Sequence, residues 1–510
     1  MFRTISLALL SGFLLSLAWP TNGFPFLLFF AFVPLLLMEQ EIHKRQSVFL
    51  LSLFAFLVWN TLTTFWIVNA TWIGVIMAVL INSLLMASAF TLFSWIKSRL
   101  GQKRGWWAFI CVWLSFEYLH FNWDLSWPWL ALGNGFSSSP ALVQWYEYTG
   151  VLGGSLWVLT ANVLAFNSWH SKRFISLALW ILLPIGLSFL VEPSLKEIDK
   201  VNVVVVQPNI DPYSEKFDGM GPEKQLEKFL LLASEKVDST TDFLIGPETA
   251  LTGGLWENNL DQSPLINQLK NYLINYPQLK IIVGASTYRM YDKEEVLTET
   301  ARYHQRAEGY YDAYNTALQI DTSGIQIYHK SKLVPGVETM PFAPLLQHIK
   351  SLSIDLGGIS GSLGSQKERS VFYSKQATVA PIICYESIYG EYVLEYIRRG
   401  ADVLTIITND GWWKDTPGYR QHLAYASLRA IETRRVIARS ANTGISGFID
   451  AKGNISKATE WWQSAVISAE LPTYQGITFY TLYGNYIGRL AAFVFVILFF
   501  YSLAKREVRD

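Results

Sequence analysis

The chain has 510 residues, of which 51% are hydrophobic, 15% aromatic and 16% charged. Because about a quarter of the residues in a typical soluble protein are charged, this composition indicates a membrane protein. Lys plus Arg equal Asp plus Glu at 41 each, and a formal net charge of zero gives no support for nucleic acid as a partner.

Hydrophobic residues are concentrated toward the two ends of the chain. Seven apolar segments precede residue 193 and an eighth lies near the C-terminus, and most approach the ~20 residues that cross a bilayer as a helix. They span residues 4–20, 24–38, 48–69, 73–96, 105–121, 150–169, 174–191 and 484–503. The second and fifth are the shortest or most interrupted. The first resembles a signal peptide, but Ala-Trp-Pro-Thr-Asn-Gly is a poor cleavage site, so we interpret it as an uncleaved span.

Basic residues lie in alternate connections between these segments. The connections 21–23, 70–72 and 122–149 contain no Lys or Arg. The other connections and the C-terminal tail hold Lys44, Arg45, Lys97, Arg99, Lys103, Arg104, Lys172, Arg173, Lys505, Arg506 and Arg509. Cytoplasmic connections are enriched in Lys and Arg, so both termini are predicted to be cytoplasmic. The chain is then predicted to be a multi-pass membrane protein with residues ~194–480 outside the cytoplasm. In a bacterium with an outer membrane, this means the inner (cytoplasmic) membrane, with the large interior region in the periplasm.

Residues 194–480 differ from the apolar ends, because β-rich and helical stretches alternate there. Strands are predicted at 201–206, 243–246, 280–284, 316–320, 325–328, 378–383, 403–408, 436–440, 447–450 and 465–469. Helices are predicted at 223–236, 265–276, 389–399 and 419–433. Such alternation is typical of a layered α/β domain. We therefore predict a seven-span domain at 1–193, an extracytoplasmic catalytic domain at 194–480, and a final span with a cytoplasmic tail at 481–510.

Cys384 is the first candidate for chemistry in this region. It ends the predicted strand 378–383, and Glu386 follows two residues later. The other cysteine, Cys111, lies inside an apolar segment, so Cys384 has no soluble partner for a disulfide. A lone thiol in this position is a candidate nucleophile. The alternative is a buried structural cysteine, which is common in protein cores.

Other polar residues also follow predicted strands. Glu248 comes just after 243–246, Lys330 follows the strand at 325–328, and Asn409 and Asp410 follow 403–408. Since α/β folds build their sites beyond the carboxyl ends of strands, these side chains are expected to converge with Cys384. Each of them alone would more often be structural or solvated, and the ordered set favours the catalytic interpretation.

Three motifs in this region resemble those of a known superfamily. Gly-Pro-Glu-Thr (246–249), Tyr-His-Lys-Ser-Lys-Leu-Val-Pro (328–335) and Cys-Tyr-Glu-Ser (384–387) resemble the Glu-Lys-Cys motifs of the nitrilase, or carbon–nitrogen hydrolase, superfamily. They match in type and in chain order. Asn315-Thr-Ala before Asp-Thr-Ser-Gly (321–324) also resembles that superfamily.

The membrane arrangement and three further motifs narrow the resemblance. Trp-Pro-Trp-Leu-Ala-Leu-Gly (127–133), Gln-Pro-Asn-Ile (207–210) and Thr-Asn-Asp-Gly-Trp-Trp (408–413) lie on a seven-plus-one arrangement of spans. The whole chain resembles the apolipoprotein N-acyltransferase family, the membrane branch of the superfamily. The implied fold is an α/β nitrilase-like αββα sandwich domain carried on a bundle of eight transmembrane helices.

The resemblance implies a catalytic triad of Glu248, Lys330 and Cys384. Glu248 would take the thiol proton, and Lys330 would stabilise the tetrahedral oxyanion with a backbone N–H near Cys384. Glu338 could orient Lys330 or assist proton transfer, although the family's Leu-Val-Pro-Phe-Gly-Glu reads Leu-Val-Pro-Gly-Val-Glu at 333–338. Glu386 is expected to be a structural acid. The supporting residues Asn315 and Asn409 are expected to hold loops by hydrogen bonds.

The implied reaction has two half-reactions. Cys384 attacks a fatty ester of a phospholipid and forms a thioester, and the free amine of an apolipoprotein's N-terminal diacylglyceryl-cysteine then attacks that thioester. Water must be excluded between the two steps. Candidates for lids or acyl-chain contacts, with ordinary packing as the alternative, are Trp256, Phe342, Tyr385, Trp412 and Trp413.

No cofactor or metal is expected from the sequence. The seven histidines show no paired ligand spacing, and no Walker or Rossmann glycine pattern occurs. Two other interpretations remain open. A membrane-anchored amidase or nitrilase would hydrolyse a small C–N substrate with the same triad, and a non-enzymatic receptor or scaffold would need no complete triad.

Overall fold

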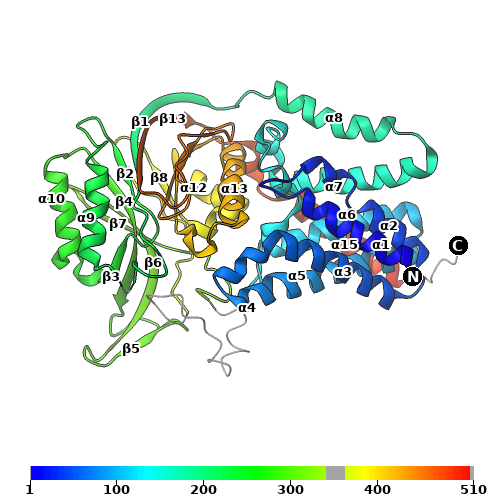
Figure 1. The fold of residues 1–510 in the computed structure, drawn as a ribbon, viewed down its shortest axis with the longest axis horizontal. Helices are drawn as coiled ribbons and strands as arrows, with labels where there is room; N and C mark the ends of the chain where they lie inside the picture. Colours follow the sequence, from blue (N-terminus) through cyan, green and yellow to red (C-terminus); the bar gives the residue numbers. More distant parts are fainter. Residues whose placement is uncertain (1, 218, 340–361, 506–510) are drawn as a thin grey trace. The chain divides into compact units, whose positions relative to one another are not determined.

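Apolar helices and a layered α/β region form two separate units in the computed structural model, which describes residues 2–217, 219–339 and 362–505 (Figure 1). The helical unit comprises Met1–Ser194, Arg420–Glu432 and Thr478–Asp510. The α/β unit comprises Leu195–Tyr419 and Thr433–Ile477. The short segment Arg420–Glu432 is part of helix α13 (Pro417–Thr433), so one continuous helix contributes to both units.

The helices of the helical unit follow the apolar segments of the sequence. The longer ones are α1 (Phe2–Leu17), α3 (Arg45–Thr64), α5 (Asn82–Leu100), α6 (Gln102–His120), α7 (Tyr146–Ser171), α8 (Ile175–Leu190) and α15 (Tyr486–Leu503). Within the described residues, four helical stretches are long and apolar enough to cross a membrane, at Arg45–Asn69, Ile76–Leu100, Tyr146–Ser171 and Tyr486–Leu503. Phe2–Leu17 and Ile175–Leu190 are apolar but shorter.

Eight membrane-spanning helices are therefore not confirmed, and two predicted spans differ for clear reasons. The segment 24–38 is broken into the short 3-10 helix Pro25–Phe29 and α2 (Val33–Glu41). Nine helical residues rise only about 14 Å, against a hydrocarbon core of about 30 Å. Helix α6 has 19 residues, but it includes the charged residues Lys103, Arg104 and Glu117.

The segment of α13 in the helical unit is held by buried polar contacts. Trp129 Nε1 donates to Gln421 Oε1 at 2.8 Å, and Gln421 Nε2 donates to the Pro20 carbonyl at 3.0 Å. The Tyr425 hydroxyl donates to the Trp129 carbonyl at 2.9 Å and accepts from Trp19 Nε1 at 3.0 Å. Because buried polar groups need partners, these bonds fix the helix among the segments around residues 19–20 and 129.

The described part of the α/β unit contains two sheets. The first has eight strands in the order β13-β1-β2-β4-β6-β5, with β3 beside β4 and β7 beside β6. Its strands are β1 (Lys196–Gln207), β2 (Phe243–Ile245), β3 (Leu251–Trp256), β4 (Lys280–Met290), β5 (Arg302–His304), β6 (Gly309–Asp321), β7 (Gly324–His329) and β13 (Ala465–Gln475). The second sheet has the order β12-β11-β10-β9-β8. Its strands are β8 (Val379–Ile383), β9 (Val403–Thr408), β10 (Val436–Ala441), β11 (Gly447–Ile449) and β12 (Ile455–Ser456).

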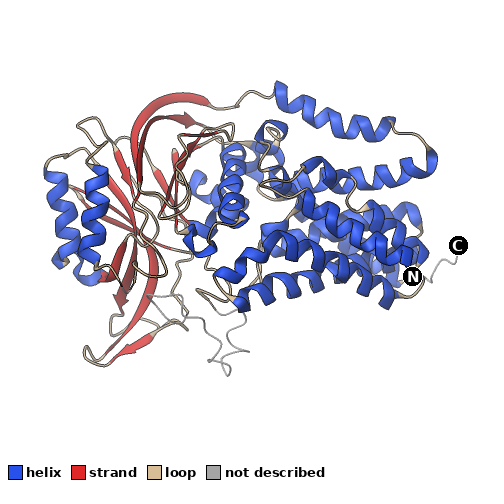
Figure 2. Cartoon of the chain, viewed as in Figure 1, coloured by secondary structure: helices blue, strands red, loops and turns tan. Residues whose placement is uncertain are grey.

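Helices cover these sheets and enclose an apolar core. Figure 2 shows α9 (Pro222–Ala233) and α10 (Pro264–Ile274) side by side next to the first sheet. Their buried faces pack against β1, β2, β4 and β6 in one cluster that includes Phe229, Leu269 and Ile281. The sheets meet where Ser440 Oγ donates to the Val206 carbonyl at 2.8 Å, and α12 (Gly390–Arg398) packs on β8. The predicted layered α/β fold is therefore confirmed.

All four predicted helices of this region are present, as α9, α10, α12 and α13, whereas three short strands among the described residues (β3, β5 and β12) were not predicted. The most informative of these is β3, which contains Gly253 and Gly254 at φ +92° and +70°. Glycine adopts positive φ without steric cost, so the chain can bulge here and still pair with β4. Two consecutive glycines are typical of a turn, so the sequence does not predict a strand here.

Candidate active site

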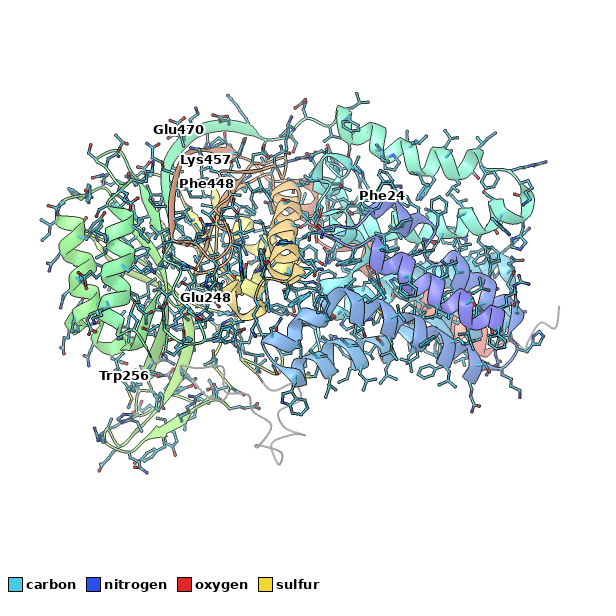
Figure 3. All side chains as sticks on the ribbon, in the orientation of Figure 1. Phe24, Glu248, Trp256, Phe448, Lys457 and Glu470 are labelled. Atoms are coloured by element: carbon cyan, nitrogen blue, oxygen red, sulfur yellow. The ribbon has the colours of Figure 1, made fainter. Side chains whose placement is uncertain are left out.

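Parallel strands bring the candidate residues to the same edges of the two sheets. Strands β1, β2 and β4 are parallel neighbours, as are β8, β9 and β10. Glu248 follows β2, Cys384 follows β8, and Asn409 follows β9. Figure 3 labels Glu248, which is buried, and Trp256, which is the last residue of β3. This is the placement that the carboxyl ends of parallel strands favour for a site.

Lys330 lies between two acidic residues of the candidate site, Glu248 and Glu338. Its side chain is 1% exposed, and Nζ donates to Glu248 Oε1 at 3.2 Å and to Glu338 Oε1 at 2.8 Å. Its backbone N–H donates to the Asn315 carbonyl at 2.8 Å, directly after β7. Burial lowers the pKa of Lys330, but Glu248 and Glu338 outweigh that effect and hold the pKa well above its usual value. The ammonium is therefore charged at neutral pH.

Glu248 is held by donors from three elements. Asn315 Nδ2 donates to Oε1 at 2.8 Å, and the Asn409 backbone N–H donates to Oε2 at 3.1 Å. Burial raises the pKa of the carboxyl, but Lys330 and the Asn315 hydrogen bond oppose it, and the net pKa is lowered. Glu248 is thus a buried carboxylate that is ionised at neutral pH and can accept a proton.

Cys384 occupies a conformation that is uncommon for a residue with a side chain. Its φ is +49°, in the left-handed region, where the chain leaves β8 for the turn Cys384–Ile388. Such strain is found at functional sites more often than elsewhere. Burial raises the pKa of the thiol well above its usual value, Glu248 raises it further, and Lys330 opposes the rise. The resting thiol is therefore neutral and needs a base.

Glu338 reaches the site despite the altered loop before it. Its Oε1 accepts from Lys330 and, at 3.0 Å, from Asn315 Nδ2, while Oε2 accepts from the Val334 backbone N–H at 2.8 Å. Gly336, at φ +80°, donates its N–H to the Thr339 carbonyl at 2.7 Å. The glycine that departs from the family motif thus closes a turn that returns Glu338 toward Lys330.

Glu386 forms hydrogen bonds that connect the turn Cys384–Ile388 to the segment after β7. It is fully buried, and its Oε2 accepts from the Ile383 N–H at 2.8 Å. Its Oε1 accepts from the Ser331 N–H at 2.7 Å and from the hydroxyls of Tyr328 and Tyr392 at 2.7 and 2.6 Å. Burial raises its pKa against the effect of these hydrogen bonds. Glu386 therefore has the contacts of a structural acid, as its position in the motif suggests.

Two buried charged residues near the site were not identified from the sequence. Arg439 on β10 donates to Asp410 Oδ2 at 2.5 Å, and Thr408 Oγ1 donates to Asp410 Oδ1 at 2.6 Å, so the turn that carries Asn409 is fixed. Lys216 donates through Nζ to the Glu248 carbonyl at 2.9 Å. No motif pointed to Lys216, and only the rarity of buried lysines could have done so after the fold was known.

The aromatic candidates have varied surroundings. Trp256 packs against Tyr288, His304 and Tyr311, with ring centroids 5.2 to 5.5 Å apart. Tyr385 is buried beside Tyr389 at 5.3 Å. Trp412 stacks on Phe217 at 6.2 Å, and Trp413 is partly buried in the same short helix, Asp410–Trp413. Phe342 lies outside the described residues. Ordinary packing thus accounts for Trp256, whereas Trp412 and Trp413 lie three and four residues after Asn409.

Replacing Lys330 should make the Cys384 thiol less reactive. Lys330→Met removes the cation that lowers the thiol pKa, so less thiolate is present at a given pH. We expect alkylation by iodoacetamide at pH 8 to slow about tenfold for each unit by which the pKa rises. Intact mass in a Cys111→Ala background gives the rate. Lys375→Met, at an exposed lysine of the same unit, should keep the unsubstituted rate. An unchanged rate in Lys330→Met would contradict this electrostatic coupling.

Comparisons with known proteins agree with this architecture. Residues 11–164 match the family model of the apolipoprotein N-acyltransferase N-terminal domain, and residues 202–476 match that of carbon-nitrogen hydrolase. The chain is 32% identical to an apolipoprotein N-acyltransferase of Chlorobaculum tepidum, over 94% of this chain and 93% of that protein. It is 28% identical to one of Geobacter metallireducens, over 95% and 92% of the two chains. The chain therefore belongs to the apolipoprotein N-acyltransferase family and carries a carbon-nitrogen hydrolase domain.

Proposed function

We propose that this chain transfers a fatty acyl chain from a phospholipid to the N-terminal amine of diacylglyceryl apolipoproteins. The observation that carries the proposal is the buried ammonium of Lys330. Its Nζ lies 3.2 Å from Glu248 Oε1 and 2.8 Å from Glu338 Oε1, and it is close enough to the Cys384 thiol to interact with it electrostatically. Such a site supplies a nucleophile, a base and a fixed positive charge, which acyl transfer requires. Family membership supplies the acceptor class.

In the first half-reaction, Glu248 takes the Cys384 proton as the sulfur attacks the carbonyl carbon of a phospholipid ester. Lys330 and a backbone N–H near Cys384 stabilise the resulting oxyanion. When the C–O bond breaks, Glu248 returns the proton to the departing alkoxide, and a lysophospholipid leaves. The fatty chain stays on Cys384 as a thioester. Glu338 and Asn315 keep Lys330 and Glu248 in place through the hydrogen bonds described above.

In the second half-reaction, the free amine of the diacylglyceryl-cysteine attacks the thioester. Glu248 takes a proton from the amine, the C–S bond breaks, and the thiolate of Cys384 recovers that proton. An amide is much more stable than a thioester, so the transfer needs no ATP. The site must exclude water between the steps, and Tyr385, Trp412 and Trp413 are the described aromatic residues that we assign to this role.

The membrane arrangement forms part of the proposal. We assign residues 1–193 to a seven-span domain, 194–480 to a periplasmic catalytic domain, and 481–510 to a last span with a cytoplasmic tail. The four long apolar helices and the basic residues in alternate connections support this assignment. An inner-membrane location would bring the catalytic domain to the phospholipids that serve as acyl donors.

A second candidate is a membrane-anchored amidase that hydrolyses a small C–N substrate. The match of residues 202–476 to carbon-nitrogen hydrolase favours it, because the same three residues would serve both reactions. The two candidates differ in the final acceptor, which is water for the amidase and an amine for the transferase.

The proposed thioester can be observed directly. Incubation with phospholipid and no acceptor should add the mass of one acyl chain, which hydroxylamine removes. Cys384→Ala should show no adduct, and Glu248→Gln and Lys330→Ala should form it at least about 100-fold more slowly, because each loses a group that acts on the transition state. Glu227→Gln, at an exposed acid on α9, is the control. Rapid acylation of Glu248→Gln or Lys330→Ala would refute the role given to that residue.

The topology can be tested with single cysteines in a Cys111→Ala, Cys384→Ala background. Lys293→Cys, at an exposed position of the α/β unit, should react with a membrane-impermeant maleimide in intact spheroplasts. Lys44→Cys, between the second and third apolar segments, should react only after the membrane is permeabilised. The reverse pattern would show that the α/β unit is cytoplasmic.

A further inference from the structure

A polar cavity lies beside Glu248 and has no part in the reaction steps above. Its volume is about 480 Å³, within the usual range for small-ligand sites. It is bounded by Lys216, by the N-terminal end of α9 at Pro222, and by residues of β3 and β4 that include Thr252, Ser286 and Tyr288. The bulge of β3 opens this side of the sheet, because Leu251 pairs with Ala285 whereas Leu255 pairs with Thr287.

The cavity is lined by a buried lysine. Lys216 is 2% exposed, and Nζ donates to the Glu248 carbonyl at 2.9 Å. Gln225 Nε2 fixes the backbone around it by donating to the carbonyls of Lys216 and Met220 at 2.6 and 2.7 Å. An ammonium has three N–H donors, and no carboxylate among the described residues forms an ion pair with this one. Burial lowers the pKa of Lys216 to about 7, against the effect of Glu248.

A second polar group in the wall lacks a partner. Thr252 is 5% exposed and lines the cavity, and its hydroxyl makes no hydrogen bond to any described residue. Buried hydroxyls are normally paired, so this enclosed and unpaired hydroxyl, on a residue that lines the cavity, is available to a ligand that reaches it. Ser286 adds another hydroxyl to the same wall. A buried ammonium with nearby hydroxyl donors is the donor set that phosphate oxygens prefer.

We infer that this cavity binds the phosphodiester of the acyl donor, with Lys216 and Thr252 as ligands to its oxygens. The inference rests on the proposed function for the identity of the donor. Only a few bonds separate the phosphodiester of a glycerophospholipid from its fatty esters, and Lys216 touches the residue proposed as the base. One donor molecule could therefore place its phosphate here and its ester at Cys384.

Such a site would also solve a problem of selectivity. The diacylglyceryl group of the acceptor carries two fatty esters of its own, and their carbonyl chemistry is the same as that of the donor. The diacylglyceryl-cysteine group lacks a phosphate. A phosphate subsite thus directs Cys384 to the phospholipid esters and leaves those of the acceptor intact.

Two acyl donors with the same fatty chain distinguish phosphodiester binding by Lys216 and Thr252 from simple positioning of Glu248. The first is a phospholipid and the second is a p-nitrophenyl ester, which has no phosphate. Lys216→Met should lower kcat/KM for thioester formation from phospholipid at least about tenfold, and Thr252→Val several-fold, mainly through KM. Thr252→Val should remain within about twofold of the unsubstituted chain on the p-nitrophenyl ester, and Lys216→Met, which also loses its contact with Glu248, should lose at least about fivefold less on that ester than on phospholipid. Lys224→Met, at an exposed lysine in the first turn of α9, is the matched control.

Equal losses on both donors would assign Lys216 to the support of Glu248 and overturn the inference, as would no loss on phospholipid. Thr252→Val keeps the shape of the side chain and tests the site even if Lys216→Met does not fold.

A direct measurement of ligand binding to the cavity tests the inference independently of the proposed reaction. Calorimetry with glycerophosphoethanolamine, a headgroup without acyl chains, should detect binding to the unsubstituted chain and at least about tenfold weaker binding to Thr252→Val or Lys216→Met. Inorganic phosphate should bind more weakly than the diester. Equal or tighter binding of inorganic phosphate would mean a free-phosphate site and would overturn the donor assignment, and so would the absence of binding. If no donor acylates Cys384 but the diester still binds, the proposed function fails and the anion site stands.

Discussion

The buried ion cluster around Lys330 is the constraint on which the α/β unit depends. One ammonium lies between two carboxylates in a region with little water, and each charge is costly without its partners. Loss of Lys330 would leave two buried carboxylates in mutual repulsion, and loss of either acid would weaken the field at Cys384. The cluster keeps Glu248 ionised while the thiol stays neutral, so the base and the nucleophile differ in protonation before any substrate arrives.

The fold holds this cluster through groups that do not belong to it. Glu386 joins the Cys384 turn to the backbone after Lys330, and the Asp410–Arg439 pair fixes the turn that presents the Asn409 N–H to Glu248. Hydrogen bonds therefore join the carboxyl end of β8 to that of β7, and the carboxyl end of β9 to that of β2. These hydrogen bonds determine the distances within the cluster more than the flexible side chain of Lys330 does.

Much of this architecture could be predicted, because local patterns determine it. The strands before Glu248 and Cys384 are short apolar runs, and polar residues that follow such runs collect at one sheet edge. The position of Glu338 does not follow from local pattern, since no sequence rule states that Gly336 at positive φ would return it to Lys330. Lys216 and Arg439 could not be identified, because their partners are distant in sequence and neither lies in a motif. Strand β3 was not predicted because its two glycines resemble a turn. The segment 24–38 was predicted as one membrane span because apolar composition alone does not reveal the break before α2.

The central claim is that an amine, not water, receives the acyl chain from Cys384. The most direct measurement isolates the enzyme acylated from a phospholipid with a radiolabelled fatty chain and follows the label in one turnover, with and without a diacylated lipopeptide. The account predicts that the label persists on the enzyme without acceptor and moves to the lipopeptide as an N-acyl amide when it is added. Release of the label as free fatty acid at the same rate in both cases would contradict the account.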